Sequence, residues 1–96
     1  MIARHYIIHA RQGEEKSVKA GLVELVELAR STPGCRGIDL LHDLDNGCRF
    51  FFLETWESVE AHKSAVNPDA SALLARLIPL FDGRPEAAYC GKVSTA

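Results

Sequence analysis

Apolar and β-branched residues dominate the start of the chain, and the pattern then changes to that of a helix. Residues 2–10, with the sequence IARHYIIHA, are typical of a β-strand. After Gln12-Gly13, apolar side chains recur every three or four positions, which predicts an amphipathic helix; they are Val18, Leu22, Leu25, Val26 and Ala29. We expect Pro33-Gly34 to end this helix.

Two strand-like segments follow and predict a β-hairpin. Residues 35–44, CRGIDLLHDL, and residues 48–56, CRFFFLETW, flank Asp45-Asn46-Gly47. Asn-Gly between two such segments is a strong hairpin signal, because the tightest turns require positive φ angles. The tightest register would place Glu54 opposite Asp39, and opposed like charges are unfavourable. Either an arginine neutralises the pair, or a longer loop shifts the register.

A short helix and a longer helix are expected after the hairpin. Ser58 can cap the short helix. Asn67-Pro68-Asp69 is a typical start for the longer one, with Asn as the cap and Pro at the first helical position. Pro79 should end or kink this helix. Its predicted apolar face consists of Ala70, Leu73, Leu74, Leu77, Ile78 and Phe81.

The last element is a strand over residues 85–93, which follows the turn residues Asp82-Gly83. The order is therefore strand, helix, strand, strand, helix, strand. With right-handed crossovers, this order predicts a ferredoxin-like α+β sandwich (βαββαβ), in which four antiparallel strands carry the helices on one face. The sequence has no repeat, low-complexity tract or linker, so we expect residues 1–96 to form a single domain.

The third strand is apolar on both of its faces. Phe50 and Phe52 point to one side of the sheet, and Phe51 and Leu53 point to the other. A sheet that is covered on one side only normally alternates apolar and polar residues. Helices can cover one face, and the simplest cover for the second face is another copy of the same sheet. We therefore predict a homodimer that associates through its sheet faces.

Composition narrows the class of protein further. Of the 96 residues, 47% are hydrophobic, which is sufficient for a core, and the net charge is −2. Basic residues are scattered singly, so we expect neither nucleic acid nor a membrane surface as a partner. The N-terminal segment lacks the apolar stretch of a signal peptide. Three cysteines without CxxC spacing indicate reduced thiols, so the expected location is the cytoplasm.

Three segments together carry a family resemblance: PGCRGIDLL before and within the second strand, FFLETWESVEAH at the end of the third, and LFDGRPE before the last. With them the chain resembles the antibiotic biosynthesis monooxygenase (quinol monooxygenase-like) family over nearly its whole length. The resemblance implies a dimeric α+β barrel. Some members oxidise polycyclic phenols or quinols with O₂ and no metal or flavin. Others degrade haem, isomerise small molecules or have no assigned activity.

The sequence departs from the commoner family pattern at several positions. Many relatives carry a His nine residues after the Trp and then a Ser/Thr-Pro-His-Phe run. Here the first position is Ala65, and Asn67-Pro68-Asp69-Ala70 replaces the run. Haem-degrading relatives use an Asn on the first strand and a His on the second helix. The corresponding positions here are Tyr6 and Leu74-Ala75, which disfavours haem chemistry.

His62 and Tyr6 are the candidate catalytic residues. In a cofactor-free oxygenase a base deprotonates the substrate, whose anion then reduces O₂, so the site needs a base, hydrogen-bond donors and an apolar cavity. His62 follows Trp56 by six residues and could lie at the mouth of such a cavity, or it could be an ordinary, partly exposed helix histidine. Tyr6 could orient a ligand oxygen or could simply pack, with its hydroxyl bonded to the backbone.

Four further residues are candidates for contacting the substrate. Phe52, Glu54 and Trp56 alternate along one face of the third strand, where Trp56 could stack on a planar ligand or belong to the core. Glu54 needs a partner because it lies on an apolar strand, and we expect an ion pair across the dimer. Asn67 stands where relatives carry the Ser/Thr-Pro-His-Phe run.

A metal site is not expected. His5 and His9 are four residues apart, a spacing that suits chelation on a helix. On a strand the two side chains share a face but stand about 13 Å apart, too far to bind one ion together. We expect them to face the dimer side and to form hydrogen bonds there. Cys35 and Cys90 are interpreted as small buried residues, and His42 as a solvated one.

Three functions follow from these interpretations. The resemblance favours a cofactor-independent monooxygenase that acts on a small phenolic, quinol-type or electron-rich carbonyl compound. The partner would then be a small aromatic or quinone-like molecule, with no cofactor. The first alternative is an isomerase or lyase that transfers protons in the same cavity. The second is a non-catalytic binding module, which a cavity filled by its own side chains would favour.

Overall fold

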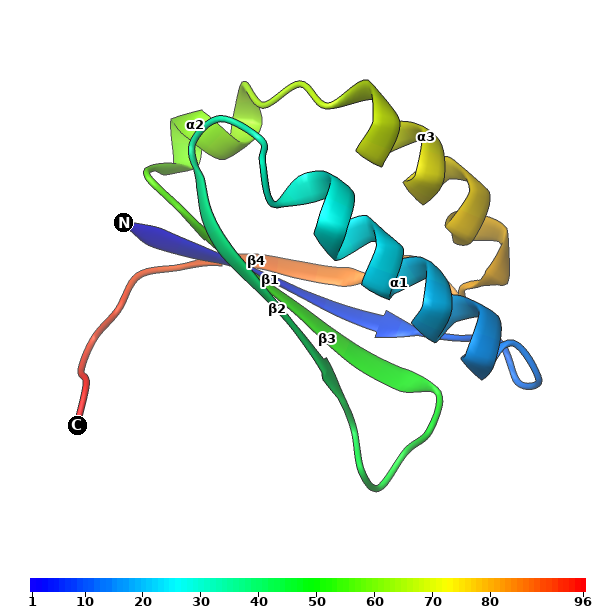
Figure 1. Cartoon of the computed structure of the whole chain (residues 1–96). Coiled ribbons are helices and arrows are strands. Elements are labelled where there is room, and N and C mark those ends of the chain that lie inside the picture. The colour runs from blue at the N-terminus through cyan, green and yellow to red at the C-terminus, as the bar shows by residue number, and fades with distance from the viewer.

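A four-stranded antiparallel sheet with the strand order β2-β3-β1-β4 forms one layer of the protein. The computed structural model describes residues 1–96. Figure 1 shows α1 and α3 side by side on one face of this sheet. The fold class predicted from the sequence, a ferredoxin-like α+β sandwich, is confirmed. The elements are β1 (Ile2–His9), α1 (Glu15–Ala29), β2 (Cys35–His42), β3 (Arg49–Trp56), α2 (Val59–Lys63), α3 (Pro68–Leu77), the 3₁₀ helix η1 (Ile78–Leu80) and β4 (Glu86–Cys90).

Both long helices begin and end close to the predicted positions. Helix α1 follows the turn at Gly13, which has a φ of 90°. Helix α3 begins at Asn67, whose side chain accepts a hydrogen bond from the backbone N–H of Ala70. It ends at Leu77, and Pro79 lies in the tighter turns of η1, because proline cannot donate the hydrogen bond that an α-helix requires.

The hydrophobic core lies between the sheet and the two long helices. Phe50 and the predicted helix positions Val18 and Leu22 are fully buried. The helices approach closely at Gly21, where an added Cβ would lie 2.2 Å from a methyl group of Leu77. The other core side chains are Ile8, Ala10, Leu25, Phe52, Leu73, Leu77 and Phe81.

The hairpin between β2 and β3 has a longer loop than the Asn-Gly signal predicts. Glu54 pairs with Ile38, and Asp39 pairs with Leu53. The tightest register is therefore wrong by one residue, and the alternative of a longer loop is correct. Polar side chains stabilise this loop: Asn46 accepts a hydrogen bond from the backbone of Cys48. A one-residue shift moves a side chain to the opposite face, so Asp39 does not oppose Glu54.

The second face of the sheet carries no helix, as Figure 1 shows. Phe51 and Leu53 point to this face and are half-buried, whereas their neighbours Phe50 and Phe52 are buried under the helices. Leu41 on β2 is 50% exposed. The open face is therefore apolar in its centre, which is the condition from which a sheet-to-sheet dimer is predicted. None of the helices has both the length and the apolar character needed to cross a membrane.

Candidate functional site

A cavity of about 430 Å³ lies between the helix-covered face of the sheet and the helices. Twelve of its 19 lining residues are hydrophobic, so its wall is predominantly apolar. All six residues predicted from the sequence to form a site line this one cavity. They are Tyr6, Phe52, Glu54, Trp56, His62 and Asn67. The cavity is open, whereas the alternative of a non-catalytic binding module is favoured by a cavity that its own side chains fill.

Strand alternation brings three of these residues to the cavity wall. Phe52, Glu54 and Trp56 are buried at alternate positions of β3 and point towards the helices. On the neighbouring strand, Tyr6 pairs with Phe52, and the two rings meet edge to face at 6.3 Å between centroids. Because side chains alternate along a strand, the parity of the sequence was sufficient to predict this side of the wall.

His62 reaches the cavity from the short helix α2. The side chain of Ser58 caps this helix, as predicted, by accepting a hydrogen bond from the N–H of Ala61 at 3.0 Å. The imidazole Nε2 lies 3.1 Å from the hydroxyl of Tyr6, and Nδ1 lies 2.7 Å from the hydroxyl of Tyr89. The side chain is 20% exposed, so His62 is not an ordinary surface histidine.

The surroundings of His62 favour its neutral form. Burial lowers the pKa of this imidazole, and the positive charge of Arg4 lowers the pKa further. A neutral imidazole has one N–H and one lone pair. One tyrosine must therefore accept a hydrogen bond from His62 while the other donates one, and exchange of the tautomer reverses both hydrogen bonds. The two phenols and the imidazole form a continuous hydrogen-bonded chain from Tyr6 to Tyr89.

Glu54 is the buried carboxylate of the site. The indole N–H of Trp56 donates a hydrogen bond to it at 2.9 Å, and Nε2 of His62 lies 3.8 Å away. Burial raises the pKa of Glu54, although the Trp56 hydrogen bond and Arg4 oppose this effect. The partners of Glu54 belong to its own chain and lie on the helix-covered face. The ion pair across a dimer stays a prediction, and within the chain Glu54 has Trp56 and His62 as partners.

Arg4 and Tyr89 lie behind the polar end of the cavity, where they contact Tyr6 and His62, and were not predicted as site residues. The guanidinium of Arg4 lies 4.1 Å from the centroid of the Tyr89 ring and 5.0 Å from that of Tyr6. Its Nε is buried and has no hydrogen-bond partner. Tyr89 pairs with Arg4 across β1 and β4. The shared parity of Tyr89 and Ala87 in the last strand was the available signal, but it depended on knowing this long-range register.

Asn67 lines the cavity, but its amide is occupied by structural hydrogen bonds. It caps α3, and its amino group donates to the carbonyl of Leu28 and to the hydroxyl of Thr32, both at 2.9 Å. These contacts join the end of α1 to the start of α3. The geometry thus assigns Asn67 a structural role in addition to its place on the cavity wall.

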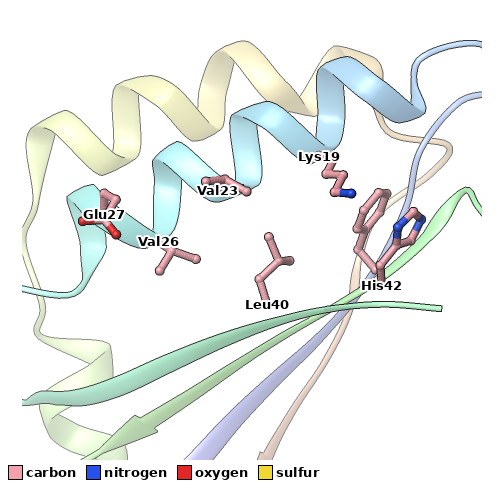
Figure 2. Close-up of a pocket in the computed structure, with 7 residues that line it drawn as sticks. Lys19, Val23, Val26, Glu27, Leu40 and His42 are labelled. Carbon is pink, nitrogen blue, oxygen red and sulfur yellow. The ribbon is translucent and has the colours of Figure 1, made fainter. Parts of the chain in front are cut away.

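A smaller groove of about 260 Å³ lies outside this cavity. Figure 2 shows Val23 and Val26 of α1 facing Leu40 on the sheet, with Lys19 near His42 at the other end. The ring of His42 is exposed, as expected, and stacks on Phe50 with 4.2 Å between centroids. No chain of hydrogen bonds comparable to that of His62 occurs in this groove.

The remaining histidines and cysteines lie apart from the cavity. His5 and His9 occupy strand β1 on the open face of the sheet, and no group of three metal-ligating side chains occurs in the chain. The cysteines form no disulfide. Cys35 and Cys90 are half-buried, so their interpretation as small buried residues is wrong. Both lie on strands at the margin of the sheet, where neighbouring elements cover them only in part.

The fold and the site together define a small α+β protein with an apolar, ligand-sized cavity that ends in a chain of ionisable groups. Comparison with protein families identifies the class. A family model described as antibiotic biosynthesis monooxygenase matches residues 1–73. The chain belongs to this family, which confirms the resemblance that its sequence motifs indicate.

Solved structures share the fold over almost the whole chain. A protein from Bordetella bronchiseptica is 23% identical, with a TM-score of 0.83 and 97% of each chain covered. One from Chloroflexus aurantiacus is 25% identical, with a TM-score of 0.81, covering 99% of this chain and 95% of the other. One from Deinococcus radiodurans is 20% identical, with a TM-score of 0.80, covering 100% and 98%. All three are named provisionally as antibiotic biosynthesis monooxygenases.

A search of curated proteins found no match. The family supports a general monooxygenase-like function, and so an oxidoreductase, without a substrate class. The similar structures show the same fold.

Proposed function

We propose that this protein is a cofactor-independent monooxygenase that oxidises a small phenolic, quinol-type or electron-rich carbonyl compound. One observation carries the proposal: a buried imidazole that favours its neutral form is hydrogen-bonded at both nitrogens to tyrosine hydroxyls, at one end of a largely apolar cavity. A neutral imidazole is a suitable general base near pH 7. The apolar wall would exclude water from a reactive anion.

The substrate supplies the electrons in this reaction. A proton leaves an enol or phenol oxygen, and the resulting anion transfers electrons to O₂. A C–O bond then forms at a ring carbon that carried two hydrogens after tautomerisation, and the O–O bond breaks. One oxygen atom becomes a carbonyl on that carbon, and the other leaves as water together with the two hydrogens. Atoms and electrons balance without any other reductant.

The hydrogen-bonded chain offers a path for the first proton. Tyr6 and His62 both line the cavity. A substrate hydroxyl at Tyr6 could pass its proton to the phenol oxygen while the phenol proton moves to Nε2 of His62. His62 would keep this proton as an imidazolium, while its Nδ1–H donates a hydrogen bond to the hydroxyl of Tyr89, whose ring does not line the cavity. In this scheme Tyr89 is a positioning residue, because it fixes the tautomer of His62.

Oxygen consumption tests this proposal. Purified, metal-stripped protein should consume O₂ with a hydroxyanthrone, quinol or catechol and no added cofactor. His62→Ala should lower the rate by roughly 10²-fold or more, because the base is lost, and Tyr6→Phe should also lower it. Tyr89→Phe should lower the rate by about tenfold, because the base remains but loses its orientation. The rate should fall as pH decreases through the lowered pKa of His62, since the protonated ring cannot accept a proton.

His42→Ala provides the matched control, because this histidine is exposed and lies outside the cavity. It should retain the parental rate. A His62→Ala or Tyr6→Phe variant as active as the parent would remove that residue from the mechanism. Absence of O₂ consumption with every compound in the panel would reject the oxygenase proposal.

Proton transfer without O₂ is the second candidate function. Glu54 and His62 approach to 3.8 Å, and burial moves the pKa of Glu54 upwards and that of His62 downwards. A carboxyl group with a raised pKa and a neutral imidazole can act as acid and base at two positions of one substrate, as an isomerase or lyase requires. Turnover of a cavity ligand under strict anaerobiosis would favour this function over oxygenation.

The sheet-to-sheet homodimer remains a proposal as well. It would cover Phe51 and Leu53, which the helices leave half-exposed on the open face. Because the cavity lies on the opposite face, each subunit would keep its own site.

A further inference from the structure

The charges along the cavity are distributed unevenly. Arg84 is the only lysine or arginine among the residues that line it. This side chain is exposed and forms no ion pair and no hydrogen bond within the chain. The neighbouring carboxylates Asp82 and Glu86 do not form a salt bridge with it. The cavity therefore has one unpaired cation on its rim.

The strand register places Arg84 well away from the acid–base end. Glu86 pairs with Ile7, and the backbone N–H of Asp82 donates to the carbonyl of His9, so Arg84 lies in the short segment between these two points. Tyr6 is one residue from Ile7 and three residues from His9 on β1, so this segment extends to about 10 Å from Tyr6 along the strand. Arg11 lies near the same end, because its backbone N–H bonds to the carbonyl of Leu80. Arg84 is thus the cation that lines this end of the cavity, whereas Arg4, at the other end, packs over the rings of Tyr6 and Tyr89 and does not line the cavity.

The opposite end is unsuited to an anion. The carboxyl group of Glu54 is buried there and lines the cavity, so a second carboxylate would have to be buried beside it. Between the two ends the wall is apolar and includes Leu25, Leu74, Ile78 and Phe81. A ligand that matches all three regions has a phenolic or enolic group, an apolar ring system and an anionic group, in that order.

We propose that the ligand of this cavity is an aromatic acid, whose carboxylate binds Arg84 while its hydroxyl lies at Tyr6 and His62. The separation of the two ends corresponds to two fused or linked six-membered rings. Arg84 is then a specificity-determining residue, because it selects anionic arenes over neutral ones of the same shape. This inference rests on the proposed function only for the identity of the reacting end.

Equilibrium binding under anaerobic conditions tests the inference without turnover. Trp56 is the only tryptophan and lines the cavity, so its fluorescence reports occupancy. The probes are 4′-hydroxybiphenyl-4-carboxylate and 4-phenylphenol, which differ only in the carboxylate. The parent should bind the acid roughly tenfold more tightly than the phenol, as one charged hydrogen bond at a partly exposed site allows. Added salt should weaken binding of the acid alone.

Variants at position 84 assign this preference to the arginine. Arg84→Gln should abolish the preference for the acid and leave the affinity for 4-phenylphenol unchanged, whereas Arg84→Lys should retain part of it. Arg76→Gln is the matched control, because Arg76 is exposed on α3 but does not line the cavity, and it should behave as the parent.

Three results would overturn the inference. The first is an equal affinity of the parent for both probes. The second is a decrease in affinity that is the same for both probes in Arg84→Gln. The third is no binding of the acid at millimolar concentration. Oxygen consumption is measured separately, so the two proposals can fail independently. A preference for the acid without O₂ consumption would reject the oxygenase and keep the ligand class. O₂ consumption with neutral phenols and no preference for the acid would keep the oxygenase and reject the ligand class.

Discussion

Glu54 is a carboxylate that its own chain removes from water, with only one-tenth of its side chain exposed. A single hydrogen bond from Trp56 compensates in part for the lost hydration. The result is a raised pKa, so the folded protein holds this proton at pH values where the unfolded chain has released it. The free energy of unfolding therefore falls as pH rises from the ordinary Glu value of 4.5 through the folded pKa.

Replacement of Glu54 should reveal how much free energy of unfolding is lost when its buried carboxyl group ionises. Glu54→Gln keeps an oxygen that accepts the Trp56 hydrogen bond but cannot ionise. Relative to the parent, we expect its Tm to rise by several degrees at pH 8 and to change little at pH 4. Thermal unfolding followed by circular dichroism at both pH values measures this difference. A Tm difference that is the same at pH 4 and pH 8 would contradict the assignment of the raised pKa to Glu54.

Single residues were predictable where strand parity decides their direction. Phe52, Glu54 and Trp56 were placed correctly on one wall because side chains alternate along a strand. Tyr89 was not predicted to belong to the site. Its hydrogen bond to His62, a residue 27 positions earlier in the chain, depends on the pairing of β4 with β1 and on the position of α2. The partners of a buried polar group are set by such long-range contacts.

At the scale of elements, helix α2 decides where the imidazole lies. It has only five residues, which is too short to be stable by itself, so contacts must hold it in place. Gly34, in the turn before β2, provides one of them. Its φ is 89°, and an added Cβ would lie 2.9 Å from the Cβ of Ala61. The turn thus packs directly against the helix that carries His62.

A pair of glycine variants separates backbone strain from this contact. Gly34→Ala adds both a left-handed backbone cost and an overlap with Ala61, so we expect a loss of about 2–4 kcal/mol in the free energy of unfolding. Gly83 has a similar φ of 82° but open space around its Cβ position. Gly83→Ala should therefore lose only about 1–2 kcal/mol.

Chemical denaturation measures both losses, and the ¹⁵N shifts of the His62 ring report its hydrogen bonds. The ring shifts should change in Gly34→Ala and stay constant in Gly83→Ala. Equal stabilities of the two variants would show that the contact between the turn and α2 contributes nothing.

At the scale of the whole molecule, the apolar open face of the sheet is the unexplained feature. Phe51 lies under the guanidinium of Arg49 at 5.1 Å, and Leu53 is half-buried without any helix above it. Exposed apolar patches of this kind usually mark an interface. The proposed sheet-to-sheet dimer accounts for the apolar character of both faces of β3.

Charge introduced on this face should separate the proposed subunits. Leu53→Asp would bury a carboxylate in the interface, so we expect the parent to sediment as a dimer and this variant as a monomer at micromolar concentration. Val23→Asp is the control, because Val23 is 51% exposed on α1, away from the open face. It should remain dimeric. Analytical ultracentrifugation measures the molecular mass in solution, and a parent that is monomeric at all concentrations would reject the dimer.

The sequence by itself determined the order of the elements, the fold class and the residues on the sheet wall of the cavity. These features follow from local periodicity, from caps such as Asn67 and Ser58, and from Pro79, each of which acts within a few residues. Family motifs determined the class of protein in the same way, since they are short segments of the chain.

Only the tertiary structure decided the hairpin register, the partners of Glu54 and the chain from Tyr6 through His62 to Tyr89. The unpaired position of Arg84 on the rim was also visible only there. The physical reason is common to all four. Packing of the whole core selects one arrangement from many that the local pattern permits equally, even where the partners are close in sequence, as Glu54 and Trp56 are.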